Sequence, residues 1–167
     1  MLPGLFENGG VYNHCNAFKI MADCRLGRAE QALSTLHKMI PDSKDNPVSI
    51  TGAEPYLFVN CWCMHPSFFT RIWFGWFTGT SAWALRGFYE GICGLRREYG
   101  GLRVQPCIPG AWKELTLTRT FRGCRYHIHI SNTGSGKPEV TVDGNRLADT
   151  LLPVLNDGQI HEVVVRT

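Results

Sequence analysis

The sequence has little charge of either sign and no long apolar run. Only 19% of its 167 residues are charged, the net charge is +3, and the lysines and arginines are scattered along the chain. A nucleic-acid-binding domain usually gathers its basic residues in one tract or on one face, so we expect no nucleic-acid partner. No stretch reaches the roughly 20 apolar residues of a bilayer-spanning helix, and the N-terminus lacks a basic segment followed by an apolar run. We therefore expect no membrane partner and no signal peptide.

The seven cysteines lack the spacing of a disulfide framework or of a zinc knuckle. Their number is odd, and several lie within apolar helix or strand patterns. This distribution is typical of reduced thiols, so we expect a cytoplasmic protein. The densest cluster, Cys61-Trp62-Cys63-Met64-His65, has a single residue between its thiols, whereas zinc knuckles usually have two or more. We expect buried thiols there, and neither a metal site nor a cysteine nucleophile.

Two stretches near the start have the apolar spacing of amphipathic helices and predict an antiparallel helix pair. The first has Asn13 as a candidate N-cap and breaks at Gly27. Its apolar face comprises Ala17, Phe18, Ile20, Met21 and Cys24. The second follows at once and ends at Pro41, because proline cannot continue a helix. The glycine-rich residues 1–13 form a loop with no element before it, so we expect the natural chain to extend upstream.

Residues 73–83 join an aromatic run to a third predicted helix through Thr78-Gly79-Thr80-Ser81. Threonine and serine are good N-caps, glycine lets an anion approach the backbone, and the first amides of a helix have no intrahelical acceptor. The stretch therefore fits an anion site, but taken alone it favours an ordinary cap on a core helix. We expect this helix to run from about residue 80 to residue 93 and to stop at Gly94. Its apolar stripe comprises Ala82, Leu85, Phe88, Tyr89 and Ile92.

The long connection of residues 42–77 is rich in proline and aromatic residues. Leu57-Phe58-Val59 has the character of a short strand. A loop of this length in a compact domain is usually functional or disordered, and the aromatic content argues against disorder. The aromatics could stack on sugar rings or pack over the helix ends as core.

From residue 101 onward, alternating apolar and polar residues predict an antiparallel β module. A hairpin turns at Arg122-Gly123, and further strands are expected at residues 139–142, 151–155 and 160–165. His127 and His129 share one strand face at the spacing of metal ligands. On a solvent-facing edge such histidines are usually ordinary polar residues, so we expect no metal there.

Several short motifs, taken in their order along the chain, carry a resemblance to a known family. They are Glu7-Asn8-Gly9-Gly10-Val11-Tyr12-Asn13-His14, Leu26-Gly27-Arg28, Glu54-Pro55-Tyr56, Trp76-Phe77-Thr78-Gly79-Thr80-Ser81-Ala82-Trp83, Gly91-Ile92-Cys93-Gly94-Leu95, Tyr99-Gly100-Gly101-Leu102, Pro106-Cys107-Ile108-Pro109, Trp112 and Phe121-Arg122-Gly123. The ordered set resembles the C-terminal part of the inverting cellobiose and chitobiose phosphorylases, glycoside hydrolase family 94. Asp45-Asn46-Pro47, Gly52-Ala53-Glu54-Pro55-Tyr56 and Asn60-Cys61 resemble relatives of the cellobionic acid type. The resemblance extends to about Ile130 and fades beyond it.

The resemblance implies a fold and a reaction. Residues 1–99 would be the last helices of an (α/α)6 barrel, the catalytic domain, and residues 100–167 a small jelly-roll-like β-sandwich domain, which makes the chain α+β. Such enzymes cleave a β-glucosidic disaccharide with inorganic phosphate and inversion, which gives an α-sugar 1-phosphate. Phosphate is a co-substrate, no cofactor is implied, and the full-length protein would be a homodimer.

The resemblance also assigns roles to particular residues. The positions that match the family's phosphate contacts are His14, Thr78 and Gly79, and the implied substrate contacts are Glu7, Glu54 and Tyr56. The family's catalytic aspartate and its phosphate-binding arginine lie in an earlier segment of the barrel and have no counterpart in this chain. Asp23 lies within a predicted helix, and Asp42 and Asp45 lie in a loop unlike the context of the acid. We therefore expect a fragment that is inactive alone.

Two alternatives remain at this point. The chain could be a non-catalytic carbohydrate-binding or assembly module that uses the aromatic loop and the β module. It could also be the phosphorylase-like domain of a cyclic β-1,2-glucan synthase, which shares the fold and differs in its acceptor.

Overall fold

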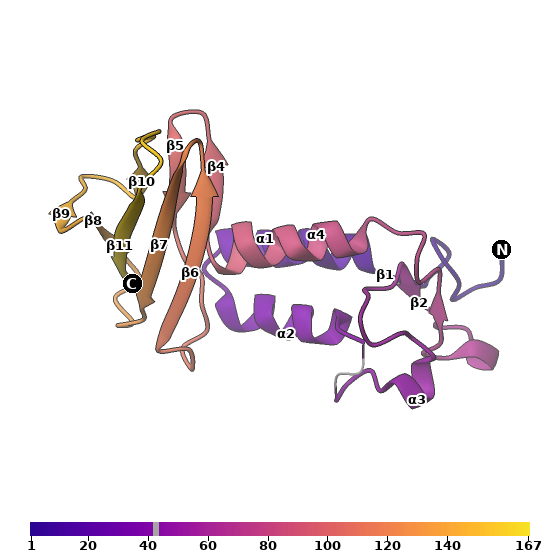
Figure 1. The fold of residues 1–167 in the computed structure, drawn as a ribbon. Coiled ribbons are helices and arrows are strands. Elements are labelled where there is room, and N and C mark those ends of the chain that lie inside the picture. The colour runs from indigo at the N-terminus through magenta and orange to yellow at the C-terminus, as the bar shows by residue number, and fades with distance from the viewer. Residues whose placement is uncertain (42–43) are drawn as a thin grey trace. The chain divides into compact units, whose positions relative to one another are not determined.

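The chain forms two compact units. The computed structural model describes residues 1–41 and 44–167 and divides into unit 1, Met1–Phe88, and unit 2, Tyr89–Thr167. Helices dominate unit 1 and sheets dominate unit 2, so the chain is α+β, as expected (Figure 1). A division of the family's domains at residues 99 and 100 stays a prediction. Within the described ranges, no helix combines the length and the apolar character that a bilayer crossing requires.

The helix pair expected at the start of unit 1 is confirmed. Helix α1 spans Asn13–Arg25 and helix α2 spans Ala29–Met39, and the two pack against each other. Gly27 adopts a left-handed φ of 71° in the turn between them. The buried apolar residues of the pair are Ala17, Ile20, Ala32, Leu36 and Met39. Phe18 was expected in the buried face but is 48% exposed, and its ring packs edge-on against Trp83.

The third helix begins where it was expected, but its buried face is different. It consists of α4, Thr80–Arg86, and a π-helical continuation, η2, Gly87–Ile92. Leu85 was assigned to the buried stripe and is 59% exposed, whereas Ala84 and Gly87 are buried. A Cβ on Gly87 would lie 3.3 Å from Ile20 of α1. The small residues therefore mark the side on which α4 packs against α1, because they let the two backbones approach closely.

The long connection of unit 1 forms short elements instead of a strand at Leu57-Phe58-Val59. They are α3, Val48–Thr51; β2, Cys61–Trp62; η1, Pro66–Phe68; and β3, Ile72–Trp73. Strand β1, Val11–Tyr12, pairs with β2, and β2 pairs with β3, all antiparallel. Val59 is fully buried against Ala53 and Trp62, and its carbonyl accepts the side-chain amide of Asn13 at 3.0 Å. A side-chain bond, not a strand ladder, therefore fixes this segment.

Unit 2 is built on two sheets. The smaller has the order β10-β5-β4 and consists of β4, Leu95–Glu98; β5, Gly101–Val104; and β10, Leu151–Leu152. The larger has the order β6-β7-β11-β8-β9. Its strands are β6, Glu114–Phe121; β7, Cys124–Ser131; β8, Glu139–Val142; β9, Asn145–Arg146; and β11, Ile160–Arg166. The expected hairpin is confirmed as β6 and β7, which pair in antiparallel register.

Four expectations about unit 2 were wrong. Strand β11 runs parallel to β7, so the module is not purely antiparallel. The β4–β5 hairpin begins before residue 100, and β10 ends at Leu152 instead of Leu155. Strand β7 lies inside the sheet, so His127 and His129 are not on an edge, although they do share a face with side chains 37% and 46% exposed.

The opposite face of the larger sheet holds a buried histidine between two carboxylates. The Asp143 carboxylate lies 2.8 Å from one ring nitrogen of His161, and the Asp157 carboxylate lies 3.1 Å from the other. These bonds, first that of Asp143, raise the pKa of His161. The pKa of Asp143 is lowered chiefly by the bond with His161, and that of Asp157 chiefly by the backbone amide of Gln159 and then by His161.

Candidate functional site

His14 lies in the first turn of α1 with one ring nitrogen bound and the other unpaired. Its Nδ1 lies 2.7 Å from the hydroxyl of Tyr12, and the two rings meet edge-on. Its Nε2 is buried and has no hydrogen-bond partner among the described residues. Buried polar atoms almost always form hydrogen bonds. The unpaired Nε2 of the half-buried His14 side chain is therefore a place where a ligand atom could bind.

Gly79 lies directly against that nitrogen. A Cβ on Gly79 would be 3.1 Å from Nε2 of His14, so the space next to the imidazole exists because this residue has no side chain. Gly79 precedes α4 with φ −84° and ψ 2°, a conformation that other residues also adopt. The backbone conformation therefore does not require glycine at position 79. The close approach to His14 is the remaining physical reason for glycine there.

Thr78 adds a hydroxyl to this site, and we refer to His14, Thr78 and Gly79 together as the corner. Its Oγ1 accepts the backbone N–H of Thr80 at 3.1 Å and lies 2.7 Å from the hydroxyl of Thr80. Thr78 thus accepts the amide of Thr80 from the position before the N-cap, and Gly79 at the N-cap position makes no side-chain bond. The side chain of Thr80 is fully buried, so it holds the hydroxyl of Thr78 in place.

Two asparagines connect the start of α1 to this corner, and neither carries a functional signal in the sequence. The carbonyl of Asn60 accepts the backbone N–H of Asn13 at 2.8 Å. The side-chain amide of Asn60 reaches Thr78 Oγ1 at 3.5 Å. Asn13 was predicted to cap α1, but its side chain is buried and bonds to Val59 instead. Asn60 therefore couples the segment that carries His14 to the segment that carries Thr78.

The expected substrate-binding residues fall into two places. Glu54 accepts the indole N–H of Trp76 at 3.3 Å, and the ring of Tyr56 lies 6.1 Å from that of Trp76. Tyr56 is 73% exposed and Trp76 is 68% exposed, so both rings are accessible to a ligand. Glu7 lies in an exposed turn near β2, where its charge adds to the raised pKa of Cys61. The structure thus groups Glu54 and Tyr56 with Trp76 and places Glu7 near Cys61 of β2.

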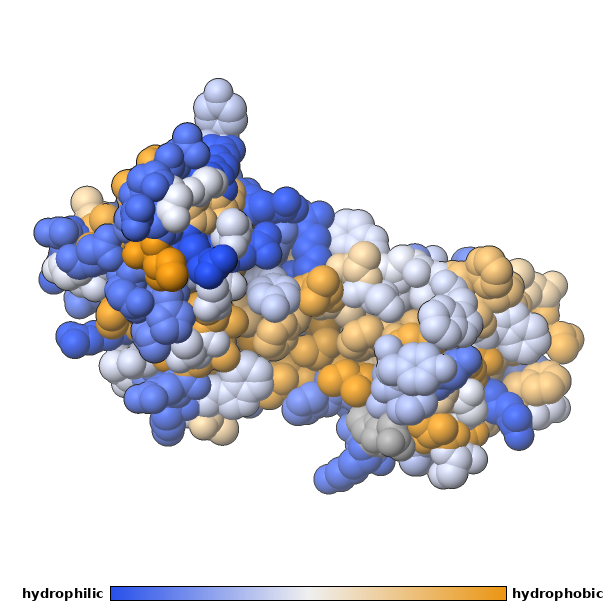
Figure 2. Space-filling view, viewed as in Figure 1, coloured by the Kyte–Doolittle hydropathy of each residue, from blue (hydrophilic) through white to orange (hydrophobic). Residues whose placement is uncertain are grey.

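The aromatic loop exposes a large apolar surface. Figure 2 shows orange and pale areas over the helices and loops of unit 1. Its exposed aromatic side chains are Tyr56, Phe68, Phe69, Trp73, Phe74, Trp76 and Phe77. Trp62 is the exception, because it is buried in the small core of the connection. Both interpretations of the loop therefore hold in part, with one aromatic in the core and most of the others at the surface.

The cysteine cluster of the connection consists of protonated thiols. Cys61 and Cys63 are buried, and burial is the largest cause of the raised pKa of each thiol. No disulfide joins any of the seven cysteines, all of which lie within the described residues 1–41 and 44–167. A raised pKa disfavours the thiolate that both metal binding and nucleophilic attack require.

Of the aspartates weighed as a possible acid, the described ones are Asp23, which is bonded elsewhere, and Asp45. The carboxylate of Asp23 is bonded to the ammonium of Lys19 at 2.6 Å one turn earlier on α1. Asp45 is exposed in the connection, and Asp42 lies outside the described residues. The corner thus offers an imidazole nitrogen, a hydroxyl and a space beside a backbone turn, which are groups that can bind an oxyanion.

Two family models match consecutive parts of the chain. The model of the glycosyl hydrolase 94 superfamily, catalytic domain, matches residues 1–94, which include the whole corner. The model of the glycosyl hydrolase family 65 C-terminal domain matches residues 95–147.

Several curated proteins are similar over nearly all of the chain. A solabiose phosphorylase of Paenibacillus borealis is 37% identical over 169 residues, which cover 98% of this chain and 22% of the relative. A 3-O-beta-D-glucopyranosyl-beta-D-glucuronide phosphorylase of the same organism is 35% identical, over 99% of this chain and 22% of the relative. A cellobionic acid phosphorylase of Neurospora crassa is 33% identical, over 97% of this chain and 21% of the relative. The chain thus spans about a fifth of the length of these relatives.

Proposed function

Because the chain belongs to the glycosyl hydrolase 94 superfamily, we propose that it forms part of a glycoside phosphorylase in which His14, Thr78 and Gly79 contact inorganic phosphate. The observation that carries the proposal is the buried Nε2 of His14, unpartnered within the described chain and 3.1 Å from where a Cβ on Gly79 would lie. Leaving a buried polar atom unbonded costs free energy, of order 1–3 kcal/mol. An oxyanion beside Gly79 would remove this cost.

The corner supplies donors of the right kind for phosphate. When the Tyr12 hydroxyl donates to Nδ1, His14 carries its proton on Nε2 and donates it to the ligand. The hydroxyl of Thr80 can donate to Thr78, which frees the proton of Thr78 for a second phosphate oxygen. Hydrogen bonds to an ionised acceptor are about twice as strong as neutral ones. Two such bonds fix the orientation of the anion as well as holding it.

The proposed reaction is inverting phosphorolysis of a β-glucosidic disaccharide. A phosphate oxygen attacks the anomeric carbon from the face opposite the leaving group, and the bond between that carbon and the glycosidic oxygen breaks. A carboxylic acid gives its proton to the leaving oxygen, and the product is an α-sugar 1-phosphate. Phosphate replaces the activated water of an inverting hydrolase and is already anionic, so no general base is needed.

The acid would come from a segment outside residues 1–167, and the helices of unit 1 would be the last ones of an (α/α)6 barrel. We expect the chain alone to be inactive, because Asp23 is engaged by Lys19 and Asp45 lies in a loop unlike the context of the family's acid. The test is to incubate the chain with phosphate and cellobiose, cellobionic acid or chitobiose and to assay sugar 1-phosphate. Turnover would contradict the missing acid without contradicting the phosphate contacts.

Phosphate binding itself can be tested on the chain with a glycine pair. Gly79→Ala places a Cβ 3.1 Å from His14 Nε2 in a backbone conformation that alanine tolerates. We expect it to keep the helical signal of the chain and to weaken phosphate binding at least tenfold by calorimetry. Gly100→Ala is the matched control, because its Cβ would meet only Leu151 at an ordinary 3.4 Å. Equal phosphate affinity in both variants would show that the ligand does not bind at the corner.

The hydrogen-bonding partners are tested by His14→Ala and Thr78→Val. Each removes one proposed donor, so each should abolish the rise in melting temperature that phosphate produces in the unaltered chain. Chloride at equal ionic strength serves as the reference for a general salt effect.

A carbohydrate-binding role without phosphate is the second candidate, and the exposed rings of Tyr56 and Trp76 favour it. Glu54 holds the indole of Trp76 in place, as a stacking platform for a sugar ring requires. Binding of cellobiose that is indifferent to phosphate and is lost in Trp76→Ala would favour this role. Binding that requires phosphate would favour the phosphorylase.

A further inference from the structure

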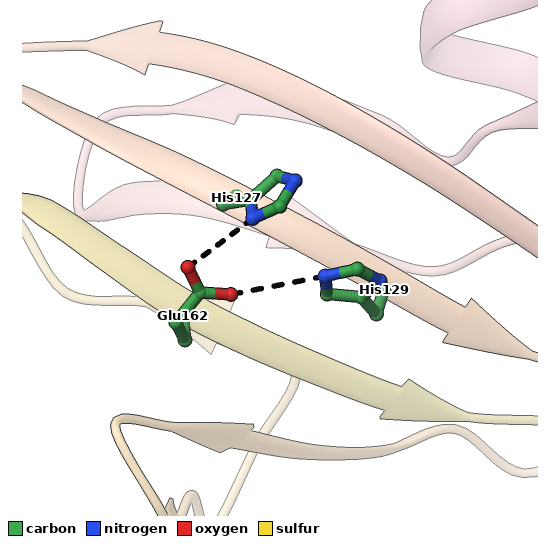
Figure 3. Close-up of side chains that lie close together, drawn as sticks. All are labelled: His127, His129 and Glu162. Atoms are coloured by element: carbon green, nitrogen blue, oxygen red, sulfur yellow. Dashed lines mark hydrogen bonds and ion pairs between the residues drawn. The ribbon is translucent and has the colours of Figure 1, made fainter.

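Unit 2 carries a cluster of potential metal ligands on the exposed face of its larger sheet. His127 and His129 are two residues apart on β7 and therefore point to the same side. Strand β11 runs parallel to β7, and Glu162 lies directly opposite His127 in the register. The Glu162 carboxylate lies between the two imidazoles, with Oε1 3.2 Å from His127 Nδ1 and Oε2 3.8 Å from His129 Nε2 (Figure 3). All three ligand atoms are within 4.8 Å of one another.

We propose that His127, His129 and Glu162 form a binding site for a divalent transition-metal ion of the Zn²⁺ type, with a coordination position open to solvent. Two imidazoles and one carboxylate are a donor set that Zn²⁺ accepts, at bond lengths of about 2.0–2.2 Å. Ligand atoms at such bond lengths are ~3.4 Å apart in a tetrahedron. The two nitrogen–oxygen separations, 3.2 Å to Oε1 and 3.8 Å to Oε2, are close to this value, and the three ligand atoms lie within 4.8 Å of one another, so side-chain rotations can bring them onto one ion. This site is independent of the proposed phosphorylase function.

The surroundings hold the ligands in the orientation that a metal needs. The hydroxyl of Thr116 on the neighbouring strand β6 lies 3.2 Å from Nδ1 of His129. This bond leaves Nε2 of His129 directed at Glu162. A hydrogen bond to the second ring nitrogen is what usually fixes the tautomer and the ring of a metal-binding histidine. The two ligand strands pair over seven residues, from Ile160 and Arg125 to Arg166 and Ser131, so they form a rigid support.

A simple ion pair does not account for the second histidine. An exposed histidine and glutamate need only one imidazole, and such a pair contributes about 0–1 kcal/mol. Here two imidazole rings lie with centroids 4.6 Å apart, both with a nitrogen facing the same carboxylate. A neutral imidazole can present either an N–H or a lone pair to the carboxylate, depending on its tautomer. With the lone pairs of both rings directed at Glu162, the two nitrogens and the carboxylate would attract a cation placed between them.

The site would link β7 to β11, the strands that form the parallel pair of the sheet. An ion that binds the folded chain and not the unfolded chain stabilises it by mass action. We therefore expect Zn²⁺ to raise the melting temperature of unit 2 in a concentration-dependent way.

The test uses zinc chloride and the complete chain, with calorimetry for affinity and histidine side-chain NMR for location. The chain has six histidines and seven cysteines, so a heat of binding alone does not identify the site. We expect one Zn²⁺ per chain and a shift of the imidazole nitrogens of His127 and His129, with the other four histidines unchanged. Shifts confined to other histidines, or no binding, would overturn the proposal.

Variants of the cluster provide the second arm. His129→Gln and Glu162→Gln should each raise the dissociation constant for Zn²⁺ at least tenfold, and Thr116→Val about tenfold through the lost orienting bond. His37→Gln is the control, because His37 is an exposed residue of α2 in unit 1. Backbone amide spectra of β7 verify that the variants fold. Equal dissociation constants in the control and in the cluster variants would overturn the proposal.

Discussion

Gly94 and Gly144 offer a matched pair of substitutions that separates backbone strain from steric exclusion. Both have a left-handed φ, 70° for Gly94 and 81° for Gly144. A Cβ on Gly144 would have no atom within 4 Å, whereas a Cβ on Gly94 would lie 1.9 Å from the carbonyl oxygen of Gln105. Alanine at either position therefore meets the same backbone penalty, and only at Gly94 does it also meet the neighbouring chain.

The expected magnitudes follow from these distances. A left-handed φ costs an alanine about 1–2 kcal/mol, so we expect Gly144→Ala to lower the free energy of unfolding by about 1 kcal/mol once the stiffer unfolded chain is counted. At Gly94 the Cβ or the Gln105 carbonyl must move by about 1.1 Å to reach the 3.0 Å that real Cβ atoms keep. Two bonds join the segments there, Gln105 N–H to Gly94 at 3.0 Å and Cys107 N–H to Ile92 at 2.9 Å. Losing both hydrogen bonds would lower the free energy of unfolding by roughly a further 2–6 kcal/mol, at 1–3 kcal/mol for each unsatisfied buried group.

The assay is urea unfolding followed through the backbone amide signals of β7 and β11, which report on unit 2 alone. We expect the Gly94→Ala variant to lose at least about 2 kcal/mol more than the Gly144→Ala variant, or to fail to populate the native signals at all. Equal losses in the two variants would refute the close approach of Gly94 to residue 105 and leave only the φ angle as the reason for glycine.

Two further predictions concern titratable groups of unit 2. The folded-state pKa of His161 is raised above 6.5, so the stability that His161 contributes is complete below pH 6.5 and is lost as the pH rises through the raised pKa. The folded-state pKa values of Asp143 and Asp157 are lowered below 3.8, so the stability that these carboxylates contribute is complete above pH 3.8 and is lost as the pH falls through the lowered pKa values. Urea unfolding across this range should therefore show a stability maximum between the two limits that flattens in His161→Gln, and an unchanged profile in that variant would contradict the assignment. Burial raises the pKa of the Cys93 thiol to about 12, so a thiol reagent at mildly alkaline pH should label exposed Cys15 in the native chain and Cys93 only after unfolding, as peptide mass spectrometry can verify.

Local sequence signals predicted the local elements. The apolar spacing located α1 and α2, because an amphipathic helix must bury one stripe wherever the rest of the fold lies. The Arg122-Gly123 turn located the hairpin for a similar reason, since its geometry depends on a few adjacent residues. Gly94 does have the left-handed φ that a helix stop requires. Each of these features is decided within about a dozen residues.

Features decided by distant contacts were missed or misassigned. The buried side of α4 is lined by Ala84 and Gly87 instead of Leu85, because closeness to α1 selects for small volume and not for hydrophobicity. The parallel pairing of β7 with β11 leaves no trace in either strand, since both parallel and antiparallel ladders accept the same alternation. The resemblance supplied His14, Thr78 and Gly79, and the periodicity of the chain would not have singled them out.

The geometry of the corner depends on two asparagines, Asn13 and Asn60, whose residue type does not by itself indicate a functional role. His14 and Thr78 belong to segments far apart in the sequence, and the bonds that bring them into register run through the carbonyl and the side chain of Asn60. Asn13 anchors the other side by donating to the Val59 carbonyl from a fully buried position. Hydrogen bonds weaken away from their preferred distance, so the bonds of the Asn13 side chain and of the Asn60 carbonyl, at 3.0 and 2.8 Å, restrict the backbone more than the 3.5 Å contact of the Asn60 side chain does. The relative position of the His14 imidazole and the Thr78 hydroxyl therefore depends in part on the two asparagines.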